Sequence, residues 1–202
     1  MRIGFIFECG RNGADGQVCQ YFADRLKPGI EIVPHYMDNK PNLLENCGSV
    51  ASILVKDCEH VVIIWDLYPA WREKRIKPCR KVDRLKVLSS LKINQVPLQK
   101  VALVCIEEEL EAWLLADTRA LRSYIATHKN PHPVGNLKNF KRPEDVKDPK
   151  THLTKIFNQE VGRRYIDYQD AITIAKAMPD FNRIRRSITF RRFAEKAAGV
   201  RL

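Results

Sequence analysis

The chain has 202 residues, of which 35 are lysine or arginine and 24 are aspartate or glutamate, so its formal net charge is +11 at pH 7. A chain of this length buries roughly 70% of its unfolded surface and needs no disulfide or structural zinc to fold. No run of about eighteen apolar residues is present, which excludes an ordinary transmembrane helix, and the six cysteines lack zinc-ligand spacing. We interpret the cysteines as reduced core residues of a cytoplasmic protein with no membrane partner.

The first part of the chain alternates between apolar runs and helical patterns. A strand is predicted over residues 2–8, followed by a helix for which Asp15 is the expected N-cap. A weaker strand is predicted over residues 30–35. It contains Pro34, which has no backbone N–H to donate, so we expect this strand at an edge of the sheet. A second helix is predicted after Pro41.

A third strand and a fourth strand extend this alternation. The third strand is an apolar run that ends at Asp66, and the fourth covers residues 101–106. The helix between them is expected to bury one stripe of residues: Val82, Leu85, Leu88 and Leu91. Continuous apolar runs are typical of strands buried on both faces of a parallel sheet, so the sequence predicts an α/β fold with about four mainly parallel strands.

The second part of the chain is predicted to be helical. A short helix is expected to begin at Glu107 and to hold Glu107, Glu108 and Glu109 in its first turn, where carboxylates interact favourably with the helix dipole. Asp117 is a candidate N-cap for the next helix. A loop rich in Pro, Asn and Lys and three short helices follow, over residues 128–149, 149–160, 168–178 and 187–198. We divide the chain into an α/β core, 1–127, and a basic loop with C-terminal helices packed on that core, 128–202.

Two of the predicted strands end in a single acidic residue, Glu8 and Asp66. The carboxyl ends of parallel strands meet at one edge of the sheet, where ligands bind. If Glu8, Asp66 and Glu111 converge there, each pair at about 4 Å repels by roughly 4 kcal/mol at an effective dielectric constant near 20. A divalent cation relieves this repulsion, so we predict a Mg²⁺ or Mn²⁺ site with these three residues as ligands.

Basic residues gather in three segments, 71–81, 138–142 and 183–192. Such clusters are typical of proteins that bind phosphates, although a solvated surface also explains any one of them. We predict that Arg72, Lys74, Arg75, Arg191 and Arg192 contact the backbone of a nucleic acid.

The order of these acidic strand ends resembles a Toprim domain, the Mg²⁺-binding module of topoisomerases, primases and OLD-type nucleases. The segment from Glu109 to Asp117, the Asp148-Pro149-Lys150 sequence, Tyr165 and the segment from Ser187 to Phe193 are more narrowly similar to a small stand-alone family of unknown function. That family is related to the OLD-like Toprim proteins and is often encoded beside an AAA-type ATPase in defence or mobile loci.

The resemblance implies a Toprim/Rossmann-like fold and a metal-dependent nuclease. Glu8, Asp66, Glu111 and Lys150 would be its catalytic residues, with Lys150 neutralising the scissile phosphate. The acidic residue that the Toprim pattern places about four positions after Glu8 appears only at Asp15, and the usual Asp-x-Asp is Asp66-Leu67-Tyr68, without a second aspartate.

The acidic strand ends and the basic segments therefore favour a Mg²⁺-dependent nuclease of nucleic acids, and the resemblance implies that it serves an ATPase-linked system such as phage defence. The alternative is a degenerate Toprim-like module that binds nucleic acid or a partner AAA/OLD-type ATPase without cleavage. The missing second aspartate favours this alternative. A third possibility is a hydrolase or transferase of small nucleotides that uses the same edge of the sheet.

Overall fold

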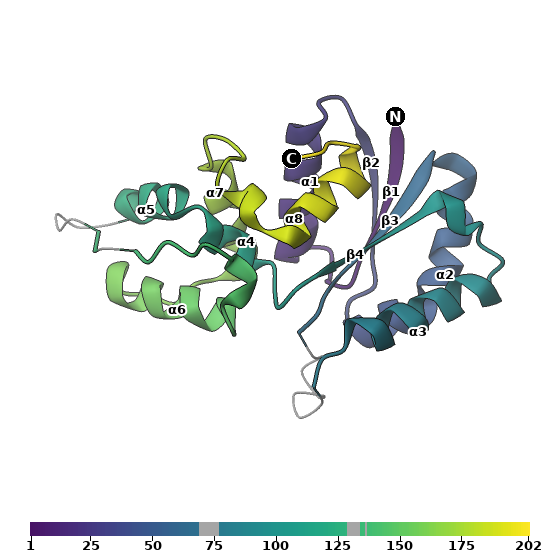
Figure 1. Cartoon of the computed structure of the whole chain (residues 1–202), viewed down its shortest axis with the longest axis horizontal. Helices are drawn as coiled ribbons and strands as arrows, with labels where there is room; N and C mark the ends of the chain where they lie inside the picture. Colours follow the sequence, from purple (N-terminus) through teal and green to yellow (C-terminus); the bar gives the residue numbers. More distant parts are fainter. Residues whose placement is uncertain (69–76, 129–133, 136) are drawn as a thin grey trace.

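A computed structural model describes residues 1–68, 77–128, 134–135 and 137–202 of the chain. Its described strands form one parallel sheet in the order β2-β1-β3-β4, as Figure 1 shows. The strands are β1 (Arg2–Phe7), β2 (Glu31–Tyr36), β3 (His60–Asp66) and β4 (Val101–Ile106). The predicted α/β class with four parallel strands is confirmed.

The position of each strand explains its sequence. Strands β1 and β3 lie in the middle of the sheet, and their apolar residues are almost entirely buried because helices cover both faces. Strand β2 pairs only with β1 and carries Pro34, so the predicted edge position is confirmed. Strand β4 forms the other edge and pairs only with β3.

Helices α2 (Lys40–Asp57) and α3 (Arg80–Ile93) cover one face of the sheet. They approach each other closely at Gly48, whose backbone N–H donates a hydrogen bond of 3.0 Å to Ser90 Oγ. A Cβ atom at Gly48 would lie 2.1 Å from the carbonyl oxygen of Ser90, so only glycine permits this crossing.

The prediction for the buried stripe of α3 is wrong in part. Val82 and Leu85 are 49% and 66% exposed, while Asp83, Val87, Ser90 and Leu91 are buried. The helix is turned toward the sheet through Asp83, which accepts hydrogen bonds from Lys40 Nζ at 2.9 Å and Trp65 Nε1 at 3.3 Å. These long-range polar contacts outweigh the burial of two exposed apolar side chains.

The other face of the sheet is covered by α1 (Ala14–Leu26) and the C-terminal helix, while the helices that directly follow β4 lie beyond its carboxyl end (Figure 1). The later elements are α4 (Glu111–Ala116), α5 (Thr118–Thr127), α6 (Pro149–Glu160), α7 (Asp167–Lys176) and α8 (Ile188–Phe193), which continues as a π-helical turn, Ala194–Ala198. The three predicted C-terminal helices are confirmed with small shifts in their ends. Asp117 is the N-cap of α5, as predicted, because its side chain accepts a hydrogen bond from the backbone N–H of Arg119.

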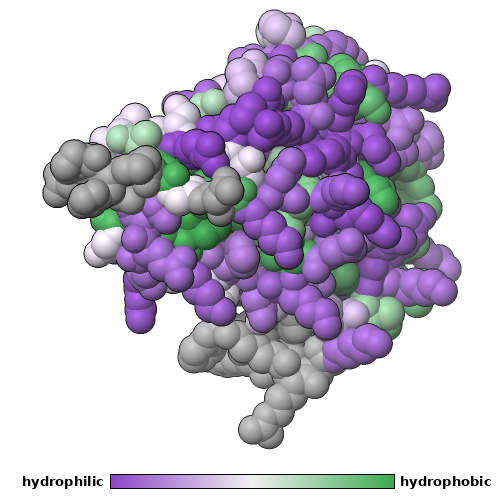
Figure 2. Space-filling view, turned by 60° about the vertical axis from the view of Figure 1, so that its left-hand side comes forward, coloured by the Kyte–Doolittle hydropathy of each residue, from purple (hydrophilic) through white to green (hydrophobic). Residues whose placement is uncertain are grey.

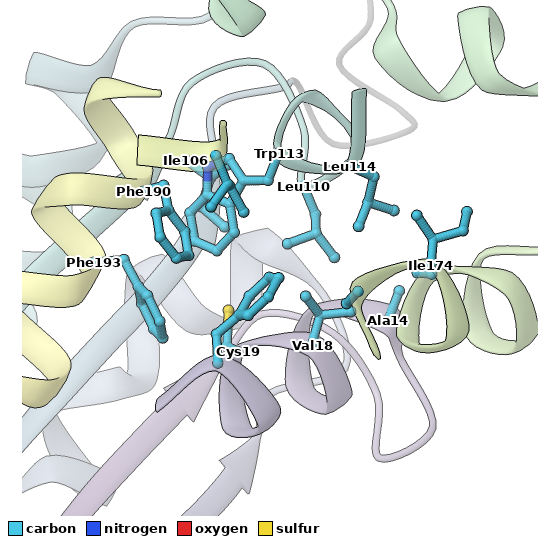
Figure 3. Packing of buried hydrophobic residues seen from close by; sticks show 14 of the residues in the cluster. Ala14, Val18, Cys19, Ile106, Leu110, Trp113, Leu114, Ile174, Phe190 and Phe193 are labelled. Atoms are coloured by element: carbon cyan, nitrogen blue, oxygen red, sulfur yellow. The ribbon is translucent and has the colours of Figure 1, made fainter. Parts of the chain in front are cut away.

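One hydrophobic cluster joins the sheet to the C-terminal helices. Figure 3 shows Trp113 of α4 in one cluster with Val18 and Cys19 of α1 and with Phe190 and Phe193, whose rings contact the Trp113 ring. Trp113 is fully buried, and its Nε1 donates a hydrogen bond of 2.8 Å to Thr189 Oγ1. Residues from both predicted parts of the chain therefore share this core.

The surface is mainly polar on the face shown in Figure 2, where hydrophobic side chains form small separate areas. All six cysteines are free, and Cys19, Cys47, Cys58 and Cys105 are buried. Within the described part of the chain, no helix is both long enough and apolar enough to cross a membrane.

The α2–α3 crossing leads to a stability prediction. Alanine normally stabilises a helix by about 1 kcal/mol relative to glycine, but Gly48→Ala is expected to lower the free energy of unfolding by about 1–3 kcal/mol because the added methyl group meets the backbone of α3. Ser49→Ala is the matched control, since Ser49 is exposed on the same helix. Urea unfolding of both variants measures the difference, and a Gly48→Ala variant as stable as the wild type would contradict the prediction.

Candidate metal centre

The carboxyl ends of β1 and β3 lie side by side in the sheet. Phe7 of β1 is in register with Ile64 of β3, so Glu8 and Asp66 both extend from the same edge. The segment beyond Asp66 continues to pair with the segment beyond β4, because the N–H of Leu67 donates a hydrogen bond of 2.7 Å to the carbonyl oxygen of Ile106. The parallel register therefore fixes the positions of Glu8 and Asp66.

Three carboxylates meet at this edge. Glu8, Asp15 and Asp66 each offer one ligand oxygen, and these oxygens all lie within 4.8 Å of one another. The prediction that Asp15 is the N-cap of α1 is wrong, because Gly13 occupies the N-cap position. Asp15 lies in the first turn of the helix, and its carboxylate belongs to the acidic group.

The turn between β1 and α1 brings Asp15 to this position. The backbone N–H of Gly13 donates a hydrogen bond of 2.8 Å to the carbonyl oxygen of Gly10. A Cβ atom at Gly13 would lie 2.5 Å from Cys9 Cβ, so the turn is too tight for another residue. The chain therefore folds back over the end of β1, and Asp15, seven residues after Glu8, returns to it.

Two of the carboxylate oxygens are buried without a partner. The three side chains are partly exposed as a whole, yet Glu8 Oε2 and Asp66 Oδ1 are inaccessible to solvent and accept no hydrogen bond from any described residue. The other Asp66 oxygen, Oδ2, accepts a hydrogen bond of 3.4 Å from the backbone N–H of Leu110. A buried oxygen without a donor is costly, so the two free oxygens point to a ligand that is positively charged.

The pKa values of the three carboxyl groups reflect the same crowding. Burial raises the pKa of Glu8 to about 8, and the nearby Asp15 raises it too. Burial also raises the pKa of Asp15 to about 6, although Lys150 opposes the change. The pKa of Asp66 is raised well above its usual range, first by burial and then by Asp15 and Glu8. Protons and divalent cations therefore compete for the same oxygens.

Glu111 lies next to this group but outside it. The side chain is 4% exposed at the start of α4, and burial raises its pKa to about 8. Its charge raises the pKa values of Asp66 and of Tyr165, which is also buried. Of the three metal ligands predicted from the sequence, the structure brings Glu8 and Asp66 together with Asp15 and leaves Glu111 as a close neighbour.

Lys150 reaches the same region from the first turn of α6. Its Nζ forms an ion pair with Asp167, and its backbone N–H donates a hydrogen bond of 3.0 Å to Glu109 Oε2. Burial lowers the pKa of Lys150, but Glu111, Asp167 and Glu109 outweigh that effect, so its pKa is raised and its charge is retained. Lys150 is therefore a cation beside the acidic group.

The residues before α4 do not form a helical turn, so the prediction for Glu107, Glu108 and Glu109 is wrong. The helix begins only at Glu111, and Glu108 adopts a left-handed backbone conformation with φ of 64°. Asp148, just before α6, has φ of 48°. Left-handed residues other than glycine are strained and concentrate at functional sites, and both loops border the acidic group.

Tyr68 lies two residues after Asp66 and contacts two other loops. Its backbone N–H donates a hydrogen bond of 2.9 Å to the carbonyl oxygen of Glu108. The pKa of its hydroxyl is raised first by a hydrogen bond to Asp148. Tyr68 therefore joins the loop after β3 to the loop before α6.

Lys40, at the start of α2, is a residue that the sequence analysis missed. Its Nζ donates hydrogen bonds to the carbonyl oxygens of Asp66, Leu67 and Tyr68 at 2.8, 3.1 and 3.3 Å, and pairs with Asp83. The side chain is only 9% exposed. Lys40 thus holds the backbone that carries Asp66, and its charge lowers the pKa of Glu8. A lysine just before a proline gives no sequence signal for such a role.

The structure describes two of the five residues that are predicted to contact nucleic acid, Arg191 and Arg192. Arg72, Lys74 and Arg75 lie outside the described residues. Arg191 is exposed on α8 and donates a hydrogen bond of 3.2 Å to the carbonyl oxygen of Arg185, while Arg192 is partly buried on the same helix.

The raised pKa values lead to a prediction about metal and pH. A carboxyl group whose pKa is higher in the folded state contributes stability below its unfolded pKa of about 4, and this stability is lost as the pH rises through the folded pKa. The metal-free protein should therefore lose on the order of 1 kcal/mol or more between about pH 5 and pH 8. Mg²⁺ or Mn²⁺ should raise the melting temperature more at pH 8 than at pH 6, because metal must displace protons.

Asp15→Asn tests whether the acidic group causes this behaviour. The variant should lose most of the metal-induced rise in melting temperature and be less sensitive to pH without metal, since one of the crowded charges is gone. Asp24→Asn, exposed on the same helix, is the matched control and should behave as the wild type. An equal metal response in Asp15→Asn and wild type would remove Asp15 from the site.

Lys40→Met tests the support of Asp66. Removing one partner of a buried ion pair should lower the free energy of unfolding by on the order of 3 kcal/mol, and metal affinity should fall because the backbone of Asp66 is released. Lys56→Met, exposed on α2, is the control. The double variant Lys40→Met/Asp83→Leu should recover stability but not metal affinity; recovery of both would show that Lys40 has no role in the site.

Comparisons with known proteins place the chain in a family. A family model described as "Domain of unknown function (DUF4276)" matches residues 27–196, a stretch that includes Asp66, Glu111 and Lys150. No curated protein and no solved structure matches the chain. Because the match covers most of the sequence, the chain belongs to the DUF4276 family.

Proposed function

We propose that this protein is a Toprim-like phosphodiesterase that cleaves nucleic acid with the help of Mg²⁺ or Mn²⁺. The observation that carries the proposal is the group of Glu8, Asp15 and Asp66 at the carboxyl edge of a parallel sheet, with two buried oxygens that lack partners. Open parallel sheets bind their ligands at this edge.

The ligand atoms favour a hard cation. All three are carboxylate oxygens, which suit Mg²⁺ and Mn²⁺ better than softer metals. Glu8, Asp15 and Asp66 would hold the ion, and the buried Glu111 would add negative charge behind them. A bound divalent cation would polarise a phosphodiester and activate a water molecule for hydrolysis.

The protein's own cations support a phosphate substrate. Lys150 keeps its charge beside the acidic group, where it would neutralise a phosphate oxygen. The basic segment 71–81, which includes Arg72, Lys74 and Arg75, follows Asp66 closely in the sequence, so the chain that leaves the site is rich in positive charge. The net charge of +11 would attract a polyanion from a distance.

The resemblance to Toprim proteins adds the biological setting. Strand β1, followed directly by Glu8, and the central strand β3, ending in Asp66, follow the Toprim order, and Asp15 stands later in the sequence than the acidic residue of that pattern but lies beside Glu8 and Asp66. By the same resemblance, a partner AAA/OLD-type ATPase and a role in phage defence are proposed for this protein. The free, mostly buried cysteines support the proposal of a cytoplasmic location.

A module that binds without cleaving is the second candidate, and Tyr68 favours it. The phenol stays protonated near neutral pH and is a poor ligand for Mg²⁺, so the site has one fewer carboxylate than the Toprim pattern. Mg²⁺ commonly takes only one or two protein carboxylates and keeps several waters, so three carboxylates remain sufficient for an active centre.

Cleavage assays test the proposal directly. Labelled single-stranded and double-stranded DNA and RNA should be cleaved with Mg²⁺ or Mn²⁺ and not with EDTA, and Glu8→Gln and Asp66→Asn should each reduce the rate by about 100-fold or more. Asp24→Asn should cleave at the wild-type rate. The carboxamide side chains of Glu8→Gln and Asp66→Asn keep the size of the original side chains, so both variants should fold. Circular dichroism checks this.

The other outcomes separate the alternatives. Metal-dependent thermal stabilisation without cleavage of any polymer would favour the binding module, because a ligand at about 100 times its dissociation constant stabilises by roughly 2.7 kcal/mol. Turnover of free nucleotides alone would favour a small-nucleotide enzyme. Cleavage that is equal in wild type, Glu8→Gln and Asp66→Asn would exclude the proposed centre.

A further inference from the structure

A hollow of about 220 Å³ lies beside the open edge of β4, and none of the three carboxylates of the acidic group lines it. Trp65 and Cys105 form its floor, and four basic side chains surround it: Arg80, Lys81 and Arg84 of α3, and Arg192 of α8. Figure 1 shows α3 and α8 on the two sides of β4, so the cations converge from elements far apart in the sequence. The hollow therefore has a strongly positive lining.

Most of this charge is not neutralised by the protein. Arg80 pairs with Glu107 at 2.9 Å, but Lys81, Arg84 and Arg192 form no ion pair with any residue that the structure describes. The acidic residue of the same helical turn, Asp83, is turned inward to Lys40 and Trp65. Several cations in the first turns of a helix also oppose the helix dipole. An anion in the hollow would relieve both effects.

The size and lining indicate a single phosphate group. Pockets for whole small molecules usually have about 300–1,000 Å³, more than this hollow offers. Arginine binds phosphate through two parallel N–H donors, and three arginines line the hollow. Trp65 is 2% exposed, so it leaves no open ring face for a base to stack on. The contact would therefore be independent of base sequence.

The hollow and the acidic group are lined by different residues. Trp65 packs with Ile63 in the cluster under α2 and α3, while Val62 and Ile64 pack in the cluster under α1. Asp66 follows Trp65 in β3, and successive side chains of a strand point to opposite faces. None of Glu8, Asp15 and Asp66 lines the hollow, so a phosphate bound there is not the one that the acidic group would cleave.

We infer that the hollow lined by Arg80, Lys81, Arg84 and Arg192 binds a backbone phosphate of a nucleic-acid strand, at a second point beyond the acidic group. The inference rests on the proposed function for the identity of the polymer. The contact holds the strand without reading its sequence and without a divalent cation.

The test is binding of a fluorescently labelled single-stranded DNA of 20 nucleotides, measured by anisotropy in EDTA over a range of salt concentrations. Lys81→Ala/Arg84→Ala should weaken binding by about tenfold, and the slope of log affinity against log salt should become shallower by about 0.7 for each lost phosphate contact. Both side chains are exposed, so folding should be unchanged.

Arg122→Ala/Lys155→Ala is the matched control, since both residues are exposed on α5 and α6, remote from α3 in Figure 1, and the charge lost is the same. The control should change affinity by less than about threefold and retain the salt slope. Three results would each overturn the inference. The two double variants could lose the same DNA affinity, or the wild type could fail to bind DNA. Polyglutamate could also displace the labelled DNA at a lower concentration of negative charges than unlabelled DNA does.

The two proposals can fail separately. If metal-dependent cleavage is observed but Lys81→Ala/Arg84→Ala does not change DNA binding, only the phosphate site in the hollow is excluded. If DNA binding is salt-dependent and is weakened in that variant but no cleavage is observed, the phosphate site in the hollow is supported and only the nuclease activity is excluded.

Discussion

Electrostatic repulsion at the carboxyl edge of the sheet is the constraint on which the rest of the site depends. Three carboxylate oxygens within 4.8 Å repel one another by on the order of 3 kcal/mol per pair at an effective dielectric constant near 20. A domain with a total stability of about 5–15 kcal/mol retains such a group only if the surrounding structure holds it in place. The parallel register of β1 and β3, the backbone N–H of Leu110 and the Lys40 side chain supply this support.

The segments that resemble the small stand-alone family contain residues with two different structural roles. Trp113 and Thr189 join α4 to α8 through a buried hydrogen bond, so they secure the packing of the C-terminal helices on the sheet. Glu111 and Lys150 lie beside the acidic group, and the buried Tyr165 lies next to Glu111. Since α4 begins with Glu111 and also contains Trp113, the same short helix fixes the packing and one wall of the site.

The sequence predicts the fold well where the signal is local. Buried apolar runs identify the strands, Pro34 identifies an edge, and the acidic residues that end two runs identify Glu8 and Asp66. Asp15 is different, because an aspartate near the start of a helix has the same local pattern as an N-cap. Only the tight turn at Gly13 shows that its carboxylate reaches β1. The buried face of α3 was also missed in part, since Asp83 is drawn inward by Lys40, which lies 43 positions earlier in the chain.

That one ion pair connects the two charged regions of the molecule. By binding Asp83, Lys40 anchors to α3 the backbone loop that carries Asp66, and so steadies the acidic group. The same contact removes Asp83 from the surface of α3, which leaves the exposed Lys81 and Arg84 without an acidic neighbour in their helical turn. A single buried contact thus keeps negative charge concentrated at one edge of the sheet and positive charge beside β4. The proposed cleavage of a nucleic acid would use both: carboxylate oxygens to hold a metal, and cations to hold the backbone.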